Sequence, residues 1–286
     1  MFTDIFSYPF MERALISAIL TALACGIIGV FVIMRGLSFM GAGIAHSAFA
    51  GAVLGILIGI NPLITALLFS LILGFGVGYT TRKGHLREDV SIGMLFSLMM
   101  ALAIVFIKLL PGYNSEAYSY LFGDVLGTSW DSMIMISLMA ITVVAVSFAF
   151  FKEFQAIIFD EEMALAMGLP VSLIFYTLLS LIAITIVASM STVGAVLVFA
   201  LITAPAAAAY QLTHRMGYLI ILSVIFAEIS AVGGIFTSAM FEFLPPGSLI
   251  VFYAVAIFFI AMYLSPKRRR LKSTGKRYGE AVDDKA

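Results

Sequence analysis

Apolar runs long enough to cross a bilayer recur along the whole of this chain of 286 residues. A spanning helix needs about 20 apolar residues, because each residue advances the helix by roughly 1.5 Å. Hydrophobic residues make up 62% of the chain and charged residues only 11%, which is far from a soluble composition. The sequence therefore predicts an integral membrane protein. The runs lie at 13–34, 38–58, 61–80, 91–110, 132–151, 171–189, 194–211, 218–241 and 248–264.

These runs are predicted to be helices in an all-α, polytopic bundle. Segments such as LIFYTLLSLIAITIV are apolar on every side, whereas the strands of a membrane barrel would alternate apolar and polar residues. Nine crossings are expected, and the tight junctions GINP at 59–62 and MSTVG at 190–194 leave eight or ten open. Residues 1–265 are expected to form the membrane domain, without a removable signal peptide, and 266–286 a basic cytoplasmic tail.

Lysine and arginine predict the orientation. If the tail is cytoplasmic, nine crossings place the N-terminus outside, and only Arg13 and Lys108 of the 16 basic residues fall near the outer face. The basic tail beside a final spanning helix is interpreted as a membrane anchor, so we expect a lipid bilayer and no nucleic acid as its partner.

Two ionisable residues lie well inside the predicted spans, namely His46 and Glu228. Such residues are costly in a bilayer and are functional candidates by default. Both are candidates for metal or proton handling, with a metal pathway as the assignment, and the alternative is that each only forms a hydrogen bond with a neighbouring helix or backbone carbonyl. The single cysteine, Cys25, excludes an internal disulfide framework and a cysteine-cluster metal site.

Small residues and a proline predict closely packed, movable helices. Gly51, Gly55 and Gly59 recur every four residues and would bare one helix face for another backbone. Pro205 removes a backbone donor and predicts a kink or discontinuity. The alternative is that these residues serve packing alone.

The segment FDEEMALAMGLP predicts a short cytoplasmic helix at about 159–168 between two spans. Asp160 is the capping residue, and Glu161 and Glu162 make the first turn acidic. The apolar residues Met163, Ala166 and Met167 follow, and Gly168 and Pro170 are stop signals. We expect it to dock into a groove on a partner, with contact to lipid as the alternative.

Five stretches in order carry a family resemblance: MRGLSFMGAGIAHSAFAG, REDVSIGMLFS, YLFGDVLGTSWDS, FDEEMALAMGLP and STVGAVLVFALITAPAAAAYQLTHR. The chain resembles the permease subunits of zinc/manganese-type ATP-binding-cassette importers. The resemblance implies a type II importer-like permease in a prokaryotic cytoplasmic membrane. It also implies a homodimer, two cytosolic ATPase subunits, an extracytoplasmic metal-binding protein, and a role for 159–168 in coupling the ATPase to the pathway.

The chain has no GxxxxGK[ST] phosphate loop, so ATP hydrolysis is expected on separate subunits and the chain itself is expected to be no enzyme. The family's motif commonly carries an acidic residue four positions before the histidine, where this chain has Ala42. That departure favours Zn²⁺ over Mn²⁺ as the transported ion, because zinc accepts imidazole readily and manganese prefers oxygen. Manganese and iron stay open as the cargo. Glu228 is the candidate for the missing carboxylate.

No permanently bound cofactor is expected. Three other functions stay open: an importer of a metal chelate such as a siderophore, haem or cobalamin, a secondary metal transporter, and an intramembrane metalloprotease. The protease is disfavoured because the sequence has no HExxH motif.

Overall fold

The computed structural model describes residues 9–84, 86–112, 114–125, 127–241 and 244–265, so the predicted basic tail lies outside the described residues. Within these ranges the chain is helical and contains no strand. Nine of the described helices are long and apolar enough to cross a membrane, and each coincides with one predicted run. They are α2 (Pro9–Arg35), α3 (Ser38–Ile58), α4 (Pro62–Gly84), α5 (Glu88–Leu109), α7 (Trp130–Ala149), α10 (Val171–Val193), α11 (Ala195–Leu212), α12 (Met216–Met240) and α13 (Pro246–Leu264).

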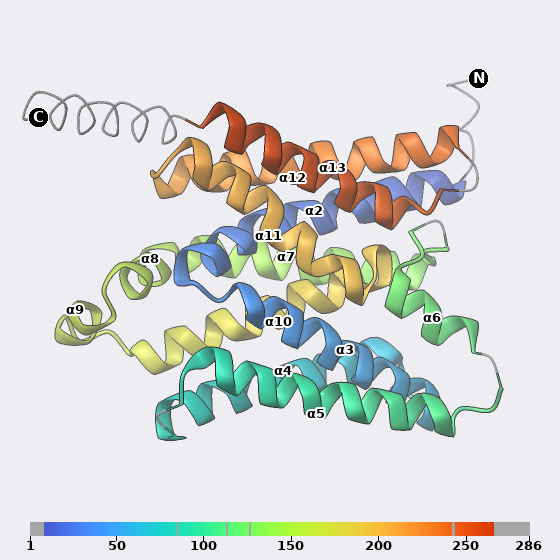
Figure 1. Ribbon diagram of the computed structural model, residues 1–286, viewed down its shortest axis with the longest axis horizontal. Helices are drawn as coiled ribbons and strands as arrows, with labels where there is room; N and C mark the ends of the chain where they lie inside the picture. Colours follow the sequence, from blue (N-terminus) through green and yellow to red (C-terminus); the bar gives the residue numbers. More distant parts are fainter. Residues whose placement is uncertain (1–8, 85, 113, 126, 242–243, 266–286) are drawn as a thin grey trace, which may run out of the picture.

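The long helices lie side by side, and α2 and α10 run through the middle of the bundle (Figure 1). Helix α2 packs against α7, α10, α11 and α12, while α3 packs mainly against α4 and α5. Apolar side chains on α5, α7 and α13 remain exposed, among them Leu98, Leu138 and Phe252. These helices therefore suit a lipid environment, where outward apolar side chains carry no hydration cost.

Polar side chains join α2 to its neighbours inside the bundle. The Cys25 thiol lies 3.1 Å from the Ser189 hydroxyl, and Thr21 lies 3.4 Å from Thr192, so two such contacts link α2 to α10. Ser223 of α12 donates a hydrogen bond of 2.7 Å to the carbonyl of Gly26 on α2. Hydrogen bonds of this kind contribute to helix association in membranes, where burial of apolar surface does not separate protein from lipid.

The α3–α4 pair shows the close approach predicted from glycine spacing. A Cβ atom on Gly51 would lie 2.8 Å from Cα of Ala66, and one on Gly55 would lie 2.9 Å from Cα of Pro62, so the two helix backbones are nearly in contact there. Gly59 has a different place. It ends α3 in a left-handed conformation at φ 74°, and a Cβ added to it would meet no atom within 4 Å, because the chain turns there toward α4.

Helix α11 continues through Pro205, so of the kink or discontinuity predicted at that residue the discontinuity is absent and the kink stays a prediction. The proline still leaves the carbonyl four residues earlier without its helical donor. The break in this region lies instead at Gly194, which separates α10 from α11 with φ 93°. A Cβ on Gly194 would lie 2.7 Å from the carbonyl oxygen of Leu121, so the end of α6 packs directly on this junction.

Two short helices at opposite ends of the bundle were not predicted from the sequence. Helix α6 (Ser115–Phe122) follows α5, and the Asn114 side chain caps it by accepting a hydrogen bond of 3.0 Å from the amide of Ala117. Helix α8 (Phe151–Phe159) follows α7 and precedes α9 (Glu161–Ala166). Figure 1 shows α8 and α9 at one end of the bundle and α6 at the other, and we call these ends the α9 face and the α6 face.

We expect Gly51→Ala to destabilise the protein, because the new methyl group meets the α4 backbone. Overpacking of this kind costs about 1–3 kcal/mol. Gly93→Ala on α5 is the matched control, since no atom lies within 4 Å of a Cβ there. Both changes add the same helix propensity, so their melting temperatures in detergent isolate the close contact. A melting temperature for Gly51→Ala as high as that of Gly93→Ala would contradict the packing described.

Candidate functional site

His46 lies near the middle of α3, with its side chain half-buried. Its ring packs edge-to-face on Phe96 of α5, with 5.0 Å between ring centroids. The Nδ1 atom is buried and has no hydrogen-bond partner in the structure. A buried imidazole nitrogen without a partner is unusual, because buried polar atoms are normally satisfied. The Nδ1 atom is therefore available as a ligand for a passing cation.

The surroundings of His46 are small and packed. Ala42 stands one turn earlier and offers no side-chain donor, and Ser47 is occupied by a hydrogen bond of 2.7 Å to the carbonyl of Phe69 on α4. The near neighbours on α3 therefore add no carboxylate to the imidazole.

Glu228 lies in the interior of α12 and is half-buried. The helix that carries it packs against α2 and α13. Among the described residues, no hydrogen bond or ion pair joins Glu228 to another side chain.

The structure does not bring Glu228 and His46 together within one chain. Helix α11 packs against both α3 and α12, and those two helices have no extensive contact with each other. The described part of the chain contains no group of three or more His, Cys, Asp and Glu residues that could hold a metal ion. His46 and Glu228 are thus two separate ionisable positions in the bundle, and the hypothesis that Glu228 completes the His46 site has no support within the protomer.

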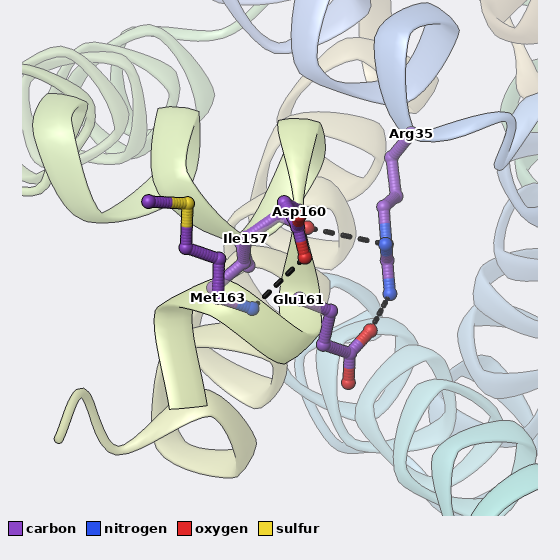
Figure 2. Close-up of polar contacts among 5 residues, drawn as sticks. All are labelled: Arg35, Ile157, Asp160, Glu161 and Met163. Carbon is purple, nitrogen blue, oxygen red and sulfur yellow. Dashed lines mark hydrogen bonds and ion pairs between the residues drawn. The ribbon is translucent and has the colours of Figure 1, made fainter. Parts of the chain in front are cut away.

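The short helix expected at 159–168 is present as α9 in a tighter form. Asp160 caps it, because the Oδ1 atom accepts a hydrogen bond of 2.9 Å from the amide of Met163 (Figure 2). Glu161 and Glu162 occupy the first turn, as predicted, and the helix ends at Ala166. Gly168 then turns the chain with φ 79°, where Leu169 bonds back to the carbonyl of Ala164.

Large apolar side chains are exposed on α9 and its flanks, next to the exposed acidic residues Asp160 and Glu162: Phe159, Met163, Leu165 and Met167 are each at least 60% exposed. Only Ala164 is buried within the helix. An exposed apolar patch of this kind marks an interaction surface. The chain itself does not cover this surface, which suits docking into a partner and also the alternative of contact with lipid.

Arg35, in the last turn of α2, is a residue of this corner that sequence reasoning counted only as a basic charge. Its guanidinium forms an ion pair with the Glu161 carboxylate and donates a hydrogen bond of 3.2 Å to the carbonyl of Ile157 (Figure 2). The ion pair joins residues that are 126 positions apart in the chain, so no local pattern indicates it.

Basic residues are distributed unequally between the two faces, whereas acidic residues occur at both. The α9 face carries Arg35, Lys83, Arg87, Lys152 and Arg215, whereas Arg13 and Lys108 lie toward the α6 face. Arg13 lies over the ring of Trp130, 5.5 Å from its centroid, an arrangement typical of a membrane interface.

A cavity of about 360 Å³ opens at the α6 face between α3, α5 and α6. Phe49, one turn beyond His46, lies in its lining together with Lys108 and Asn114. The ammonium group of Lys108 would repel a metal ion, so this cavity is not itself a cation site.

Comparisons with known proteins agree with this architecture. Residues 7–265 match the ABC 3 transport family. The chain is 36% identical over 266 residues to the manganese transport system membrane protein MntC of Listeria monocytogenes, covering 93% of this chain and 94% of that protein. It is 33% identical to the manganese import system permease protein ScaB of Streptococcus gordonii, covering 93% of this chain and 95% of that protein.

A solved structure described as PsaBC from Streptococcus pneumoniae in complex with Fab has 30% sequence identity and a TM-score of 0.86, and the match covers 96% of this chain and all of that one. The resemblance drawn from the sequence motifs is therefore confirmed. The chain is a multi-pass permease of an ATP-binding-cassette transporter in the plasma membrane, with ATP hydrolysis on separate subunits, and it belongs to the ABC 3 transport family.

Proposed function

We propose that this permease imports a divalent transition metal, with Mn²⁺ as the principal cargo, and that the ion passes His46 on its way across the membrane. The half-buried His46, with its unpartnered Nδ1 in the middle of a spanning helix, is the observation that carries the proposal. The names of the similar proteins from Listeria and Streptococcus, which state manganese transport, support the choice of metal.

Zn²⁺ is the second candidate and has its own argument. Ala42 leaves the imidazole without a carboxylate on the same helix face, and zinc accepts nitrogen ligands more readily than manganese does. Manganese would draw its oxygen ligands from water, backbone or a second copy of the chain. Zn²⁺ would therefore rely on the His46 imidazole itself, whereas Mn²⁺ would need oxygen ligands in addition to it.

A sparse ligand set suits transport. A full tetrahedral set of protein ligands would retain zinc, while a pathway site must bind weakly enough to release its ion. The absence of a three-residue ligand group among the described residues is consistent with this requirement. Glu228 serves in the proposal as a second, separate position along the route rather than as a ligand of the same ion.

The proposed assembly is a homodimer of this permease, two cytosolic ATPase subunits and an extracytoplasmic metal-binding protein. Helix α9 docks on the ATPase through its exposed apolar side chains, so the α9 face is cytoplasmic. The concentration of basic residues at that face supports the same orientation. The metal-binding protein then delivers its ion at the α6 face.

We predict that His46→Ala lowers Mn²⁺ uptake by about tenfold or more in vesicles that contain the complete complex, since even indirect metal partners often cost 10–100-fold. Uptake of Mn²⁺, Zn²⁺ and Fe²⁺ by the native complex is measured in parallel. Faster saturable uptake of Zn²⁺ than of Mn²⁺ would reverse the assignment of the cargo.

His214→Ala is the matched control, because His214 is an exposed imidazole between α11 and α12. Native uptake in His46→Ala would remove the pathway assignment of this residue. Glu228→Gln tests the second position in the same vesicles. Uptake of a haem, cobalamin or siderophore chelate in place of free ions would favour a chelate importer, and uptake that persists without the ATPase would favour a secondary transporter.

Orientation is tested by labelling introduced cysteines on intact cells with a membrane-impermeant maleimide. The native Cys25 is fully buried and gives a low background. Phe122→Cys on α6 should react from outside, whereas Arg87→Cys, between α4 and α5 on the α9 face, should react only after the membrane is opened. Both native side chains are more than half exposed and neither belongs to the docking surface of α9, so access to the label is comparable. The reverse labelling pattern would overturn the proposed topology.

A further inference from the structure

The Arg35 side chain connects three helices at the α9 face. Its Nη1 atom donates to the carbonyl of Ile157 near the end of α8, and its Nη2 atom pairs with Glu161 at the start of α9 (Figure 2). The guanidinium carbon also lies 5.9 Å from the ring centroid of Phe175 on α10. The Arg35 side chain is only 19% exposed and the Glu161 side chain 39%, so this pair is more enclosed than a surface ion pair.

The chemistry of the corner requires an arginine. The carbonyls in the last turn of α8 have no N–H donor within the helix, and the Ile157 carbonyl is one of these carbonyls. The planar guanidinium reaches that carbonyl and the carboxylate at the same time with two different nitrogens. A lysine would place one compact charge there and could not reproduce the fork.

The α2 helix is fixed to α8 close to this contact. Phe31, one turn before Arg35, packs edge-to-face on Phe154 of α8 with 5.3 Å between centroids, and both side chains are fully buried. Arg35 extends this contact to α9. Helices α2, α8 and α9 are therefore joined at one end and should move together.

Along the chain, Arg35 at the end of α2 is followed closely by α3, the helix that carries His46. The chain turns at Gly36, with φ 77°, and Leu37 bonds back to the carbonyl of Val32 over 2.9 Å. Helix α3 begins at Ser38, so His46 lies about two turns beyond this corner. The turn is short and the Leu37 side chain is only 2% exposed, so the end of α2 and the start of α3 have little freedom to move relative to each other.

We propose that Arg35 is a positioning residue that transmits displacement of α9 to the α2–α3 corner and so to the helix of His46. The proposal rests on the proposed function, because it assigns the mechanical link between the ATPase side and the metal pathway. Arg35 contacts neither the metal nor the ATPase in this scheme. It acts through Glu161 and the α8 carbonyl.

The test measures Mn²⁺ uptake and ATP hydrolysis by the complete complex in proteoliposomes. Arg35→Gln should keep basal ATP hydrolysis while uptake per ATP falls about tenfold. Uptake per ATP in Arg35→Lys should lie between the values for the native complex and for Arg35→Gln, because lysine keeps the charge without the forked guanidinium. Glu161→Gln should also lower uptake per ATP. The exchanged pair Arg35→Glu with Glu161→Arg should give a higher uptake per ATP than Arg35→Glu alone or Glu161→Arg alone.

Arg87→Gln is the control, since Arg87 forms an exposed ion pair with Asp89 on the same face, with side chains 85% and 68% exposed. Such a pair contributes little. Native uptake per ATP in both Arg35→Gln and Glu161→Gln would overturn the proposal, whatever their melting temperatures. If Arg35→Gln fails to assemble, Arg35→Lys and Glu161→Gln decide the matter by the same ratio.

A second readout does not depend on the identity of the cargo. A cysteine at Ala42 on α3 should change its reactivity with maleimide when the ATPase is trapped by ATP and vanadate, and the additional Glu161→Gln change should abolish that response. A complex that responds in this way but transports neither Mn²⁺ nor Zn²⁺ would refute the proposed cargo and keep the link. An unchanged response in Glu161→Gln would refute the link alone.

Discussion

A bilayer offers no water to satisfy backbone amides and carbonyls, and the rest of this structure depends on that constraint. Each spanning segment has to pair its own backbone groups, so the described spans are helices. The helices then need reasons to associate other than leaving water. Bare glycine faces, such as those of Gly51 and Gly55 against α4, and hydroxyl contacts between α2 and α10 provide them. In such a setting His46 places an ionisable side chain with a buried and unpartnered nitrogen near the middle of a spanning helix, which makes it a functional candidate.

The two ends of the bundle have different tasks. At the α9 face, apolar side chains that the chain itself leaves uncovered are held on a short capped helix, and Arg35 joins that helix to α2. At the α6 face, the end of α6 closes on the junction at Gly194. The helix that carries His46 runs between the two faces. Movement of α9 can therefore reach the candidate pathway through the ion pair between Glu161 and Arg35 and the short turn from α2 to α3.

Much of this architecture follows from local sequence. Nine apolar runs predicted nine spans, and the Asp160 cap with its acidic first turn predicted α9, because these signals depend on neighbouring residues. Helix α6 was missed, although Asn114 as a cap, Glu116 in the first turn and Gly123 as a stop were visible in the sequence. The contact between Arg35 and Glu161 and the separation of Glu228 from His46 depend on how distant helices pack. Residue spacing carries no information about either. Gly59 continued the spacing of Gly51 and Gly55 but ends α3, as the apolar run 38–58 indicated and the glycine spacing did not.

In the proposed function the transported ion meets the His46 imidazole. Pulsed electron paramagnetic resonance of Mn²⁺ trapped in the complete complex detects this contact, because a nitrogen ligand produces a ¹⁴N coupling and oxygen ligands do not. We expect a ¹⁴N coupling in the native complex that disappears in His46→Ala. A trapped Mn²⁺ ion with no nitrogen coupling, or with the same coupling in His46→Ala, would contradict it.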